Sequence, residues 1–400
     1  MDHWRHNLYL MWISQMLATC AFGAITPFIP IYIQDLGLTD PRAIKLWAGL
    51  VGAAPALPMV FMAPIWGALS DRIGRKPMVL RSMFGGAVSM ALFALARSVE
   101  QLLFFRIIQG MVTGVVAASF TLVATFTPEK RFGFSLGLVL SATYVGGTIG
   151  PFLGGFVADL FGFRASFLLA SFFLFSGGTG VLFMVREDFT PPGPNNPGSS
   201  GHFLSGVRIV QSDVILLSAV LMLFFSRFSR AGIIPMAPLF IQYLTPGEQY
   251  LSTISGLTFS AFGAASALSS IIMGRLGDRF GHMYILIICL IASSLLHIPQ
   301  ALSSSPWQFI IFQGATGFFM GGIFTNVFSI IGQETPVEIR GSVYGVSASA
   351  SAIGRTLGPL LCSRIAVYAG IRNVFFFVAS TLAFSGLGLF LFQRKHPSRI

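Results

Sequence analysis

Three arginines lie inside long apolar stretches of the sequence, where an unneutralised charge is costly. Arg227 and Arg230 are three residues apart in the stretch that begins near Val214, so they share one face of a helix. Arg355 stands in the middle of a later stretch, and no Asp or Glu stands beside these arginines inside the stretches. Such charges usually face a cavity or a partner. We expect them either to bind an anionic group of a substrate or to bond to backbone carbonyls at a bend, and the sequence leaves both interpretations open.

Uncharged polar side chains in other apolar stretches could share a binding cavity with the arginines. Amide, hydroxyl and phenol groups give such a cavity a few hydrogen-bonding positions on otherwise apolar walls. Taken one at a time, each is interpreted more simply as a hydrogen bond between helices. The candidates are Gln15, Thr19, Tyr144, Gln313 and Asn326.

No cluster of residues predicts catalysis or metal binding. Cys20, Cys289 and Cys362 lie in apolar stretches without the spacing of metal ligands. Nucleophiles and acid–base pairs are not grouped either, and no phosphate-binding loop of the G-x-x-x-x-G-K-[ST] type occurs. We therefore expect no enzyme activity, no catalytic residue, no metal and no cofactor, and an ion gradient as the source of energy.

The elements that must position these residues are membrane-spanning helices. Of the 400 residues, 54% are hydrophobic and 10% are charged, whereas soluble domains carry roughly 25% charged residues. A helix needs about 20 mostly apolar residues to cross the hydrocarbon layer, and a spanning backbone must satisfy its own hydrogen bonds. We therefore expect an all-α membrane protein with twelve transmembrane helices. They begin near Leu8, Trp47, Met78, Gln101, Gly133, Arg164, Val214, Ser252, Met283, Pro306, Gly341 and Arg372.

An internal repeat with a shift of about 208 residues divides the chain into two halves. With six spans each, the halves are expected to be parallel repeats that form two pseudo-symmetric six-helix bundles. We expect an N-terminal bundle over residues 1–185, a cytoplasmic linker that disfavours helix over 186–212, and a C-terminal bundle over 213–400. The repeated pairs include Pro27 and Pro235, Pro30 and Pro238, Gly150 and Gly358, and Pro151 and Pro359.

The distribution of charge follows a membrane rather than a nucleic acid. The formal net charge is +11, but Lys and Arg do not form a patch with interleaved aromatic residues. Most of them fall on segments that are cytoplasmic if the N-terminus is cytoplasmic, as the positive-inside rule requires. We expect a multi-pass protein of a bacterial inner membrane, with both termini in the cytoplasm and with the lipid bilayer, but no nucleic acid, as a partner.

The loop after the second span combines glycines at 67 and 74 with Asp71 and a run of cations. This pattern resembles the signature loop of the major facilitator superfamily, a family of membrane transporters. Its glycines permit a tight turn, and its carboxylate and cations can hold helix ends together. In that family the loop's Asp engages the other half near the start of the eleventh helix, which implies that Asp71 approaches Gly341 and keeps the cytoplasmic side shut. The residues that carry the resemblance are Gly67, Asp71, Arg72, Gly74, Arg75 and Lys76.

A second copy of this loop follows the eighth span. Asp278 and Arg279 occupy the positions that match Asp71 and Arg72. His282 stands where the family pattern has a cation, so we expect this copy to hold its helices less firmly.

Two further motifs resemble those of the drug:proton antiporter families. Gly150 and Pro151 belong to a glycine-rich run in the fifth span, where small residues let helices approach closely; helix packing alone and export of the substrate both fit this run. Arg106 and Gln109 in the fourth span resemble a motif in which the Arg couples proton movement to substrate movement, although Arg106 could also reach water at the outer end. Asp35 closes the first span and could carry a proton or simply be solvated.

The resemblance implies a secondary transporter that exports small amphipathic compounds by alternating access, as multidrug efflux proteins do. Protons would be the coupling ion, and the substrate would bind near mid-membrane between the halves. The arginines support an alternative, a transporter specific for an organic anion such as a carboxylate, a phosphonate or a siderophore. A non-transporting membrane sensor is the alternative from another class. We expect a small-molecule substrate and protons as partners, and a monomer.

Overall fold

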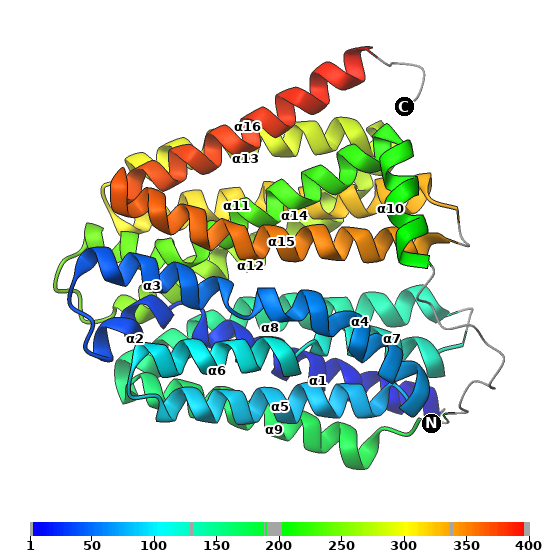
Figure 1. Cartoon of the computed structure of the whole chain (residues 1–400), viewed down its shortest axis with the longest axis horizontal. Coiled ribbons are helices and arrows are strands. Elements are labelled where there is room, and N and C mark those ends of the chain that lie inside the picture. Colours follow the sequence, from blue (N-terminus) through cyan, green and yellow to red (C-terminus); the bar gives the residue numbers. More distant parts are fainter. Residues whose placement is uncertain (1–2, 129–130, 188, 190–201, 337–338, 396–400) are drawn as a thin grey trace. The chain divides into compact units, whose positions relative to one another are not determined.

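Helices make up the regular structure of this protein, and the described residues contain no strand. The computed structural model describes residues 3–128, 131–187, 189, 202–336 and 339–395, except for the side chains of residues 3, 64, 71, 202–205, 392 and 395. Figure 1 shows the helices in chain order. They are α1 (His3–Ile25), α2 (Ile29–Asp35), α3 (Pro41–Ala53), α4 (Ala56–Ile73), α5 (Lys76–Leu95), α6 (Val99–Val112), α7 (Val115–Phe126), α8 (Phe132–Phe161), α9 (Phe163–Met184), α10 (His202–Ser212), α11 (Val214–Leu244), α12 (Leu251–Phe280), α13 (His282–Leu302), α14 (Pro306–Glu334), α15 (Arg340–Tyr368) and α16 (Ile371–Lys395).

The helices supply the twelve spans expected from the sequence. Among the described residues, eleven stretches are long and apolar enough to cross a membrane, and in two of them a pair of helices forms one stretch: Pro41–Ala63 and Val99–Phe126. The remaining span is α15, whose 29 residues are long enough. It is less apolar because Arg340, Arg355 and Arg364 lie within it.

Three of the spans contain a break that the sequence analysis did not place. The first span is interrupted at Thr26–Phe28, where Pro27 lacks the N–H donor that a continuous helix needs. The second is interrupted before α4 at Pro55. The fourth is interrupted at Thr113 and Gly114. The backbone of Gly114 has a φ of +144°, a value that residues other than glycine rarely adopt. Each break removes backbone hydrogen bonds inside an apolar span, so it must be supported by neighbouring groups.

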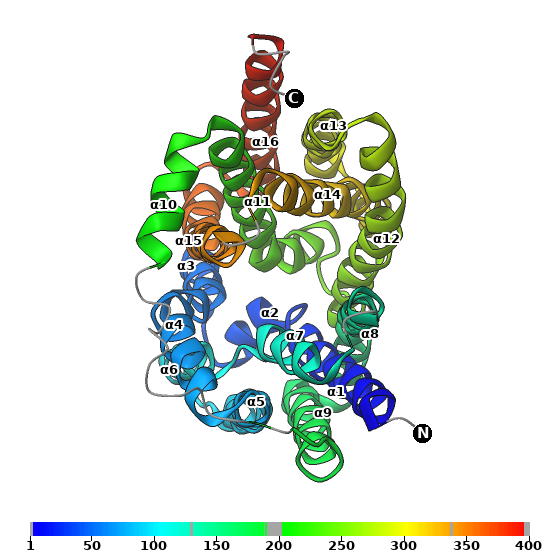
Figure 2. The ribbon, with the colours of Figure 1, turned by 90° about the vertical axis from the view of Figure 1, so that its right-hand side faces the viewer.

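The structure consists of two compact units. In unit 1, α1 packs against α8 and α9, and α5 packs against α9 (Figures 1 and 2). In unit 2, α11 packs against α14 and α15, and α13 packs against α14 and α16. The bundle boundaries predicted from the sequence stay a prediction, because the units divide α3 and α12. Unit 1 comprises Met1–Trp47, Ala54–Pro197 and Gly247–Ser260, and unit 2 comprises Ala48–Ala53, Gly198–Pro246 and Ala261–Ile400.

Glycines give both units the same closely packed helix pair. In unit 1 the pair is α1 with α8, and in unit 2 it is α11 with α15. At each contact a Cβ on the glycine would collide with the backbone of the partner helix, so only glycine permits the approach. The contacts of unit 2 are those of unit 1 shifted by about 208 residues. They are Gly146 with Met16 and Gly150 with Cys20 in unit 1, and Gly354 with Phe224 and Gly358 with Phe228 in unit 2.

The segment expected to be a linker contains a helix that the sequence analysis did not place, and the linker itself stays a prediction. α10 occupies His202–Ser212 and packs against α11 and α15. Gly206 lies so close to Ser342 of α15 that a Cβ there would press on its backbone. The sequence analysis missed this helix because the Pro- and Gly-rich run over residues 191–198 dominates the composition of the segment. Residues 190–201 lie outside the description.

Candidate substrate and coupling sites

The two neighbouring arginines of α11 rest on phenylalanine rings. The guanidinium carbon of Arg227 lies 4.0 Å from the ring centre of Phe324 on α14. That of Arg230 lies 3.5 Å from the ring centre of Phe262 on α12. A cation within about 6 Å of a ring is attracted to the negative face of that ring. The rings therefore offset part of the cost of placing these charges in an apolar span.

This arrangement suits recognition of an anion. A guanidinium presents its donors in one plane, so a ring stacked on its face leaves the edge of that plane to meet a carboxylate or a phosphonate. Arg227 and Arg230 are both partly buried, so a ligand would meet them in a setting less screened than open water. The same stacking also fixes the two side chains in place, which is the structural role that the sequence leaves open.

Two other predicted substrate residues lie on helices that pack against α11. Gln313 is buried on α14, and its Oε1 accepts no hydrogen bond from the described residues. Arg355 lies on α15, beside Gly354, whose Cα faces the backbone of α11 next to Arg227. Unit 2 therefore carries three arginines and a buried amide on α11, α14 and α15.

Asn326 makes hydrogen bonds within unit 2. Its Nδ2 donates to the carbonyl of Gly322 at 2.8 Å, and its Oδ1 lies 2.8 Å from Nδ1 of His282. Nε2 of His282 lies 3.3 Å from the carboxylate of Asp278. This chain of contacts ties the second copy of the signature loop to α14, and it favours a structural role for Asn326 over contact with a substrate. Arg279 of the same loop stacks at 5.1 Å on the neighbouring Phe280 ring.

The predicted polar residues of unit 1 lie on the α1–α8 pair. Nε2 of Gln15 donates to Oγ1 of Thr143 at 3.2 Å, while its buried Oε1 accepts no bond from the described part of the chain. The hydroxyl of Thr19 lies within hydrogen-bonding distance of the carbonyls of Gln15 (2.9 Å) and Ala142 (3.3 Å). Tyr144 follows on α8 and is partly buried. The structure brings Gln15 and Thr19 together at this helix pair, with an acceptor on Gln15 that has no partner among the described residues.

The candidate coupling pair on α6 is in direct contact. Nη1 of Arg106 donates to Oε1 of Gln109 at 2.8 Å. The guanidinium carbon lies 5.4 Å from the ring centre of Phe93, a buried residue of α5. This packing favours a fixed position for Arg106 over a side chain that reaches into water. Asp35 is exposed at the end of α2, where a solvated carboxylate needs no special partner.

A carboxylate that the sequence analysis did not identify supports the signature loop. Glu187 accepts hydrogen bonds from the backbone N–H groups of Arg75 at 2.7 Å and Lys76 at 2.8 Å. These groups begin α5, where a helix leaves N–H donors unpaired and favours negative charge. Gly74 has a φ of +98°, and a Cβ there would lie 2.9 Å from Glu187. Glycine is therefore required for this approach. No local sequence pattern marks Glu187, because it lies far from the loop along the chain.

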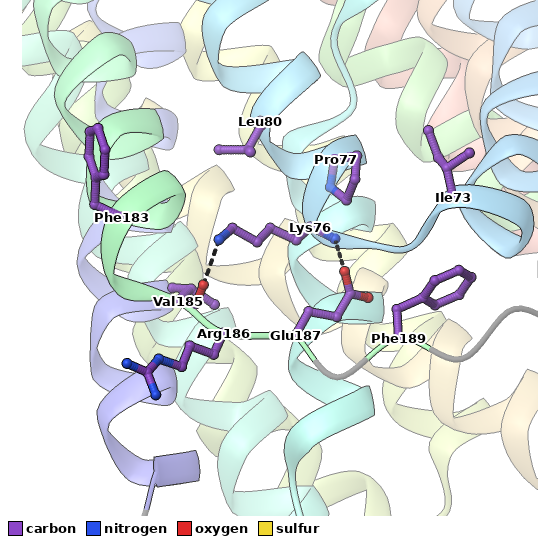
Figure 3. Close-up of a pocket in the computed structure, with 9 residues that line it drawn as sticks. All are labelled: Ile73, Lys76, Pro77, Leu80, Phe183, Val185, Arg186, Glu187 and Phe189. Atoms are coloured by element: carbon purple, nitrogen blue, oxygen red, sulfur yellow. Dashed lines mark hydrogen bonds between the residues drawn. The ribbon is translucent and has the colours of Figure 1, made fainter.

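The side chain of Lys76 binds the end of α9. Its Nζ donates to the carbonyls of Leu182 at 2.8 Å and Val185 at 2.7 Å, at the end of α9 (Figure 3). A cation there is favourable because the last carbonyls of a helix are unpaired. A cavity of about 610 Å³ opens beside these residues. It is lined by Ile73, Lys76, Pro77, Leu80, Phe183, Val185, Arg186, Glu187 and Phe189 (Figure 3).

The rest of the first loop is open. A Cβ at Gly67 would meet no atom within 4 Å, and Arg72 is exposed. The side chain of Asp71 lies outside the described residues, and its approach to Gly341 stays a prediction.

The glycine-rich motif of α8 and its copy on α15 act through packing. Gly150 and Gly358 are contact points of the two helix pairs described above. Pro151 and Pro359 lie inside α8 and α15. A Cβ at Gly23 of α1 would lie 3.0 Å from the ring of Pro151, so this proline belongs to the same contact. The direction of transport is not decided by these contacts.

Asp159 is a second carboxylate that the sequence analysis missed. At the end of α8 it accepts hydrogen bonds from the backbone N–H of Ser252 at 3.2 Å and of Thr253 at 2.7 Å, and from the Thr253 hydroxyl at 2.7 Å. It therefore caps the first turn of α12, where negative charge is favourable.

Twelve spanning helices, a duplicated six-helix pattern and a signature loop held at the start of α5 define a membrane transporter. The family model for the Major Facilitator Superfamily matches residues 11–244 and 219–400, and the chain belongs to that superfamily. It is thus a multi-pass membrane protein that transports small molecules.

Two relatives are similar over nearly their whole length. The chain is 33% identical to the multidrug resistance protein MdtG of Proteus mirabilis, covering 96% of this chain and 95% of the relative. It is 30% identical to the MdtG protein of Serratia proteamaculans, covering 100% of this chain and 96% of the relative.

Solved structures show the same fold. A human organic anion transporter, MFSD10, matches with a TM-score of 0.72 at 20% identity, over 97% of this chain and 100% of that chain. The nucleoside transporter NupG matches with a TM-score of 0.80 at 13% identity, over 96% and 99% of the two chains. At such identities the likeness concerns the fold alone.

Proposed function

We propose that this protein exports small amphipathic compounds across a bacterial inner membrane by alternating access, in exchange for protons. The observation that carries the proposal is the similarity, over nearly the full length, to multidrug resistance proteins. Two features of the drug:proton antiporter families support it: the glycine-rich run of α8 and the contact between Arg106 and Gln109 on α6. Asp35 and Arg106 are the candidate residues for proton coupling.

Flux into inside-out membrane vesicles tests this function. With an acidic lumen, we expect vesicles that contain the protein to accumulate several structurally unrelated amphipathic compounds, and a protonophore to abolish the accumulation. Arg106→Gln should remove the dependence on the pH gradient if this residue serves coupling. Accumulation that ignores the gradient would contradict proton exchange. A failure of every compound to accumulate would favour a sensor over a transporter.

A specific organic anion is the second candidate substrate. The observation that favours it is the stacking of Arg227 and Arg230 on Phe324 and Phe262, which prepares two guanidinium groups for an anion. In the same vesicles, Arg227→Gln and Arg230→Gln should reduce flux of acidic compounds and leave flux of neutral and cationic compounds in place. Equal losses for all three classes would assign the two arginines to structure.

The arrangement in the membrane follows from the same proposal. We propose that both termini lie in the cytoplasm, because this orientation places most Lys and Arg on the inner side. We also propose that the protein acts as a monomer.

A further inference from the structure

Arg81 is a cation of unit 1 that the motifs described above do not include. It lies on α5, and its guanidinium carbon is 3.7 Å from the ring centre of Trp66 on α4. Its Nη2 lies 3.1 Å from the hydroxyl oxygen of Ser82, to which it donates. Its Nε and Nη1 are buried and donate to no atom in the described part of the chain. Buried donors are normally paired, so these two atoms indicate that a partner belongs here.

Trp66 places Arg81 at the break in the fourth span. Nε1 of Trp66 donates to the carbonyl of Met111 at 2.7 Å, which ties α4 to the last turn of α6. The break follows at Thr113 and Gly114. A Cβ built on Gly114 would lie 3.9 Å from Nη2 of Arg81. The guanidinium therefore stands beside the gap between α6 and α7.

The first turn of α7 adds a second source of positive potential at this gap. Gly114 is its N-cap, and glycine has no side chain to accept from the first amides. The first backbone bond runs from Ala118 to the carbonyl of Gly114, so the preceding N–H groups have no partner within the helix. Broken membrane helices commonly direct such N-termini at anionic groups.

Among the described side chains, the two spans that meet at Arg81 offer no carboxylate near it. The span Lys76–Leu95 contains no Asp or Glu, and the span Val99–Phe126 contains only Glu100, which begins it and lies far from Gly114 along the helix. A charge at this depth needs a counter-group. The stack on Trp66 offsets part of the cost, but Nε and Nη1 of the guanidinium remain without an acceptor among the described residues.

We propose that Arg81, held on Trp66 beside the open first turn of α7, binds an anionic group of a small molecule, a carboxylate or a phosphonate. The guanidinium supplies planar donors that match the oxygens of such groups, and the first amides of α7 supply the rest. This site is in unit 1 and is separate from Arg227 and Arg230. It does not depend on whether the protein exports drugs.

Trp66 provides the readout, because its ring touches the guanidinium. We would purify the full chain with Trp66 as its only tryptophan and titrate it with benzoate, phenylphosphonate and the neutral analogue benzamide. Both anions should change the Trp66 emission saturably, and benzamide should not. Arg81→Gln should weaken the response to the anions at least about tenfold, as expected for loss of a charge-assisted hydrogen bond. The other tryptophans, each replaced by Phe, are Trp4, Trp12, Trp47 and Trp307.

Two further variants serve as controls: the same substitution at another arginine, and a conservative substitution of Arg81. Arg208→Gln changes an exposed arginine of α10 and should leave the anion response unchanged. If Arg81→Gln does not fold, Arg81→Lys decides: it keeps the charge but not the planar donors, so binding should weaken and remain saturable. An affinity that is unchanged in every Arg81 variant that folds, or a response to benzamide equal to that for benzoate, would overturn the proposal. Because no gradient is applied, a negative result here leaves the export function untouched.

Discussion

Aromatic rings lie against four arginines inside the spans of this protein. Arg81, Arg106, Arg227 and Arg230 each lie over the face of a ring within 5.5 Å of its centre. A ring attracts a cation through its quadrupole and, unlike a carboxylate, it costs nothing to place in an apolar layer. The donors of a guanidinium lie in its plane, so a ring stacked on its face does not cover them.

The contact of Arg230 with Phe262 should be measurable as a coupling energy. In a double-mutant cycle with Arg230→Met and Phe262→Leu, we expect a coupling of about 0.5–2 kcal/mol in the free energy of unfolding in detergent. The control cycle pairs Arg230→Met with Phe384→Leu, because Phe384 is mostly exposed and lies on α16. If the two cycles give the same coupling, the ring contributes packing alone.

Glu187 should control the local stability of the signature loop. Glu187→Ala removes the acceptor for the N–H groups of Arg75 and Lys76, and loss of a helix cap costs about 1 kcal/mol. We expect these amides to exchange with deuterated water about five times faster, as followed by mass spectrometry of the loop peptide. Glu334→Ala, an exposed carboxylate at the end of α14, is the control. Unchanged exchange in Glu187→Ala would show that the loop is held by other contacts.

The sequence could predict contacts between residues that are close along the chain, but not contacts between residues that are far apart in it. The resemblance to an antiporter motif identifies Arg106 and Gln109, and their contact is local because they are three residues apart on one helix face. The ring under Arg230 and the carboxylate at Lys76 could not be predicted, since both contacts join elements that are far apart in sequence. The same is true of Arg81, because its stacking on Trp66 joins α5 to α4.

At the scale of the helix, the glycines of α8 differ in function although they belong to one run. Gly146 and Gly150 face the backbone of α1, whereas a Cβ at Gly147 would meet nothing within 4 Å. A period of 3.6 residues assigns glycines to faces, but it does not say which face meets which helix. The sequence therefore predicted a packing motif without its partner. The break at Gly114 was missed for a related reason, because an isolated glycine is also tolerated inside a helix.

Substitution of single glycines in α8 should separate these roles. Gly150→Ala would collide with the backbone of Cys20, so we expect a lower unfolding temperature and reduced transport. Gly147→Ala meets open space and should leave the protein as stable or raise its stability by about 0.5–1 kcal/mol, since Ala favours helix over Gly. Unfolding in detergent, followed by circular dichroism, compares the two. A similar loss of stability in both variants would mean that the α1–α8 contact does not require glycine at position 150.

At the scale of the whole chain, the duplication extends from sequence motifs to packed atoms, and departures from it mark specialisation. Thr19 of α1 faces Gly146, and in the shifted position Arg227 of α11 faces Gly354. The helix pairs are thus repeated, while a hydroxyl in one unit is replaced by a charge in the other. The twelve spans could be predicted from the length and apolar composition of each stretch, and the repeat could be predicted from the constant shift between matching motifs. The helix α10 could not, because its apolar face matters only against α11 and α15.

A parallel duplication predicts that matching positions lie on the same side of the membrane. Asp40 and Glu248, both exposed, differ by about 208 residues and should both lie outside, whereas Gly133 and Gly341 should both lie inside. In a variant without Cys20, Cys289 and Cys362, a single cysteine at Asp40 or Glu248 should react with a membrane-impermeant maleimide in intact cells. A cysteine at Gly133 or Gly341, where a side chain meets open space, should react only after permeabilisation. Labelling of one member of a pair from outside and of the other from inside would require inverted repeats, and with them a different path of the chain through the bilayer.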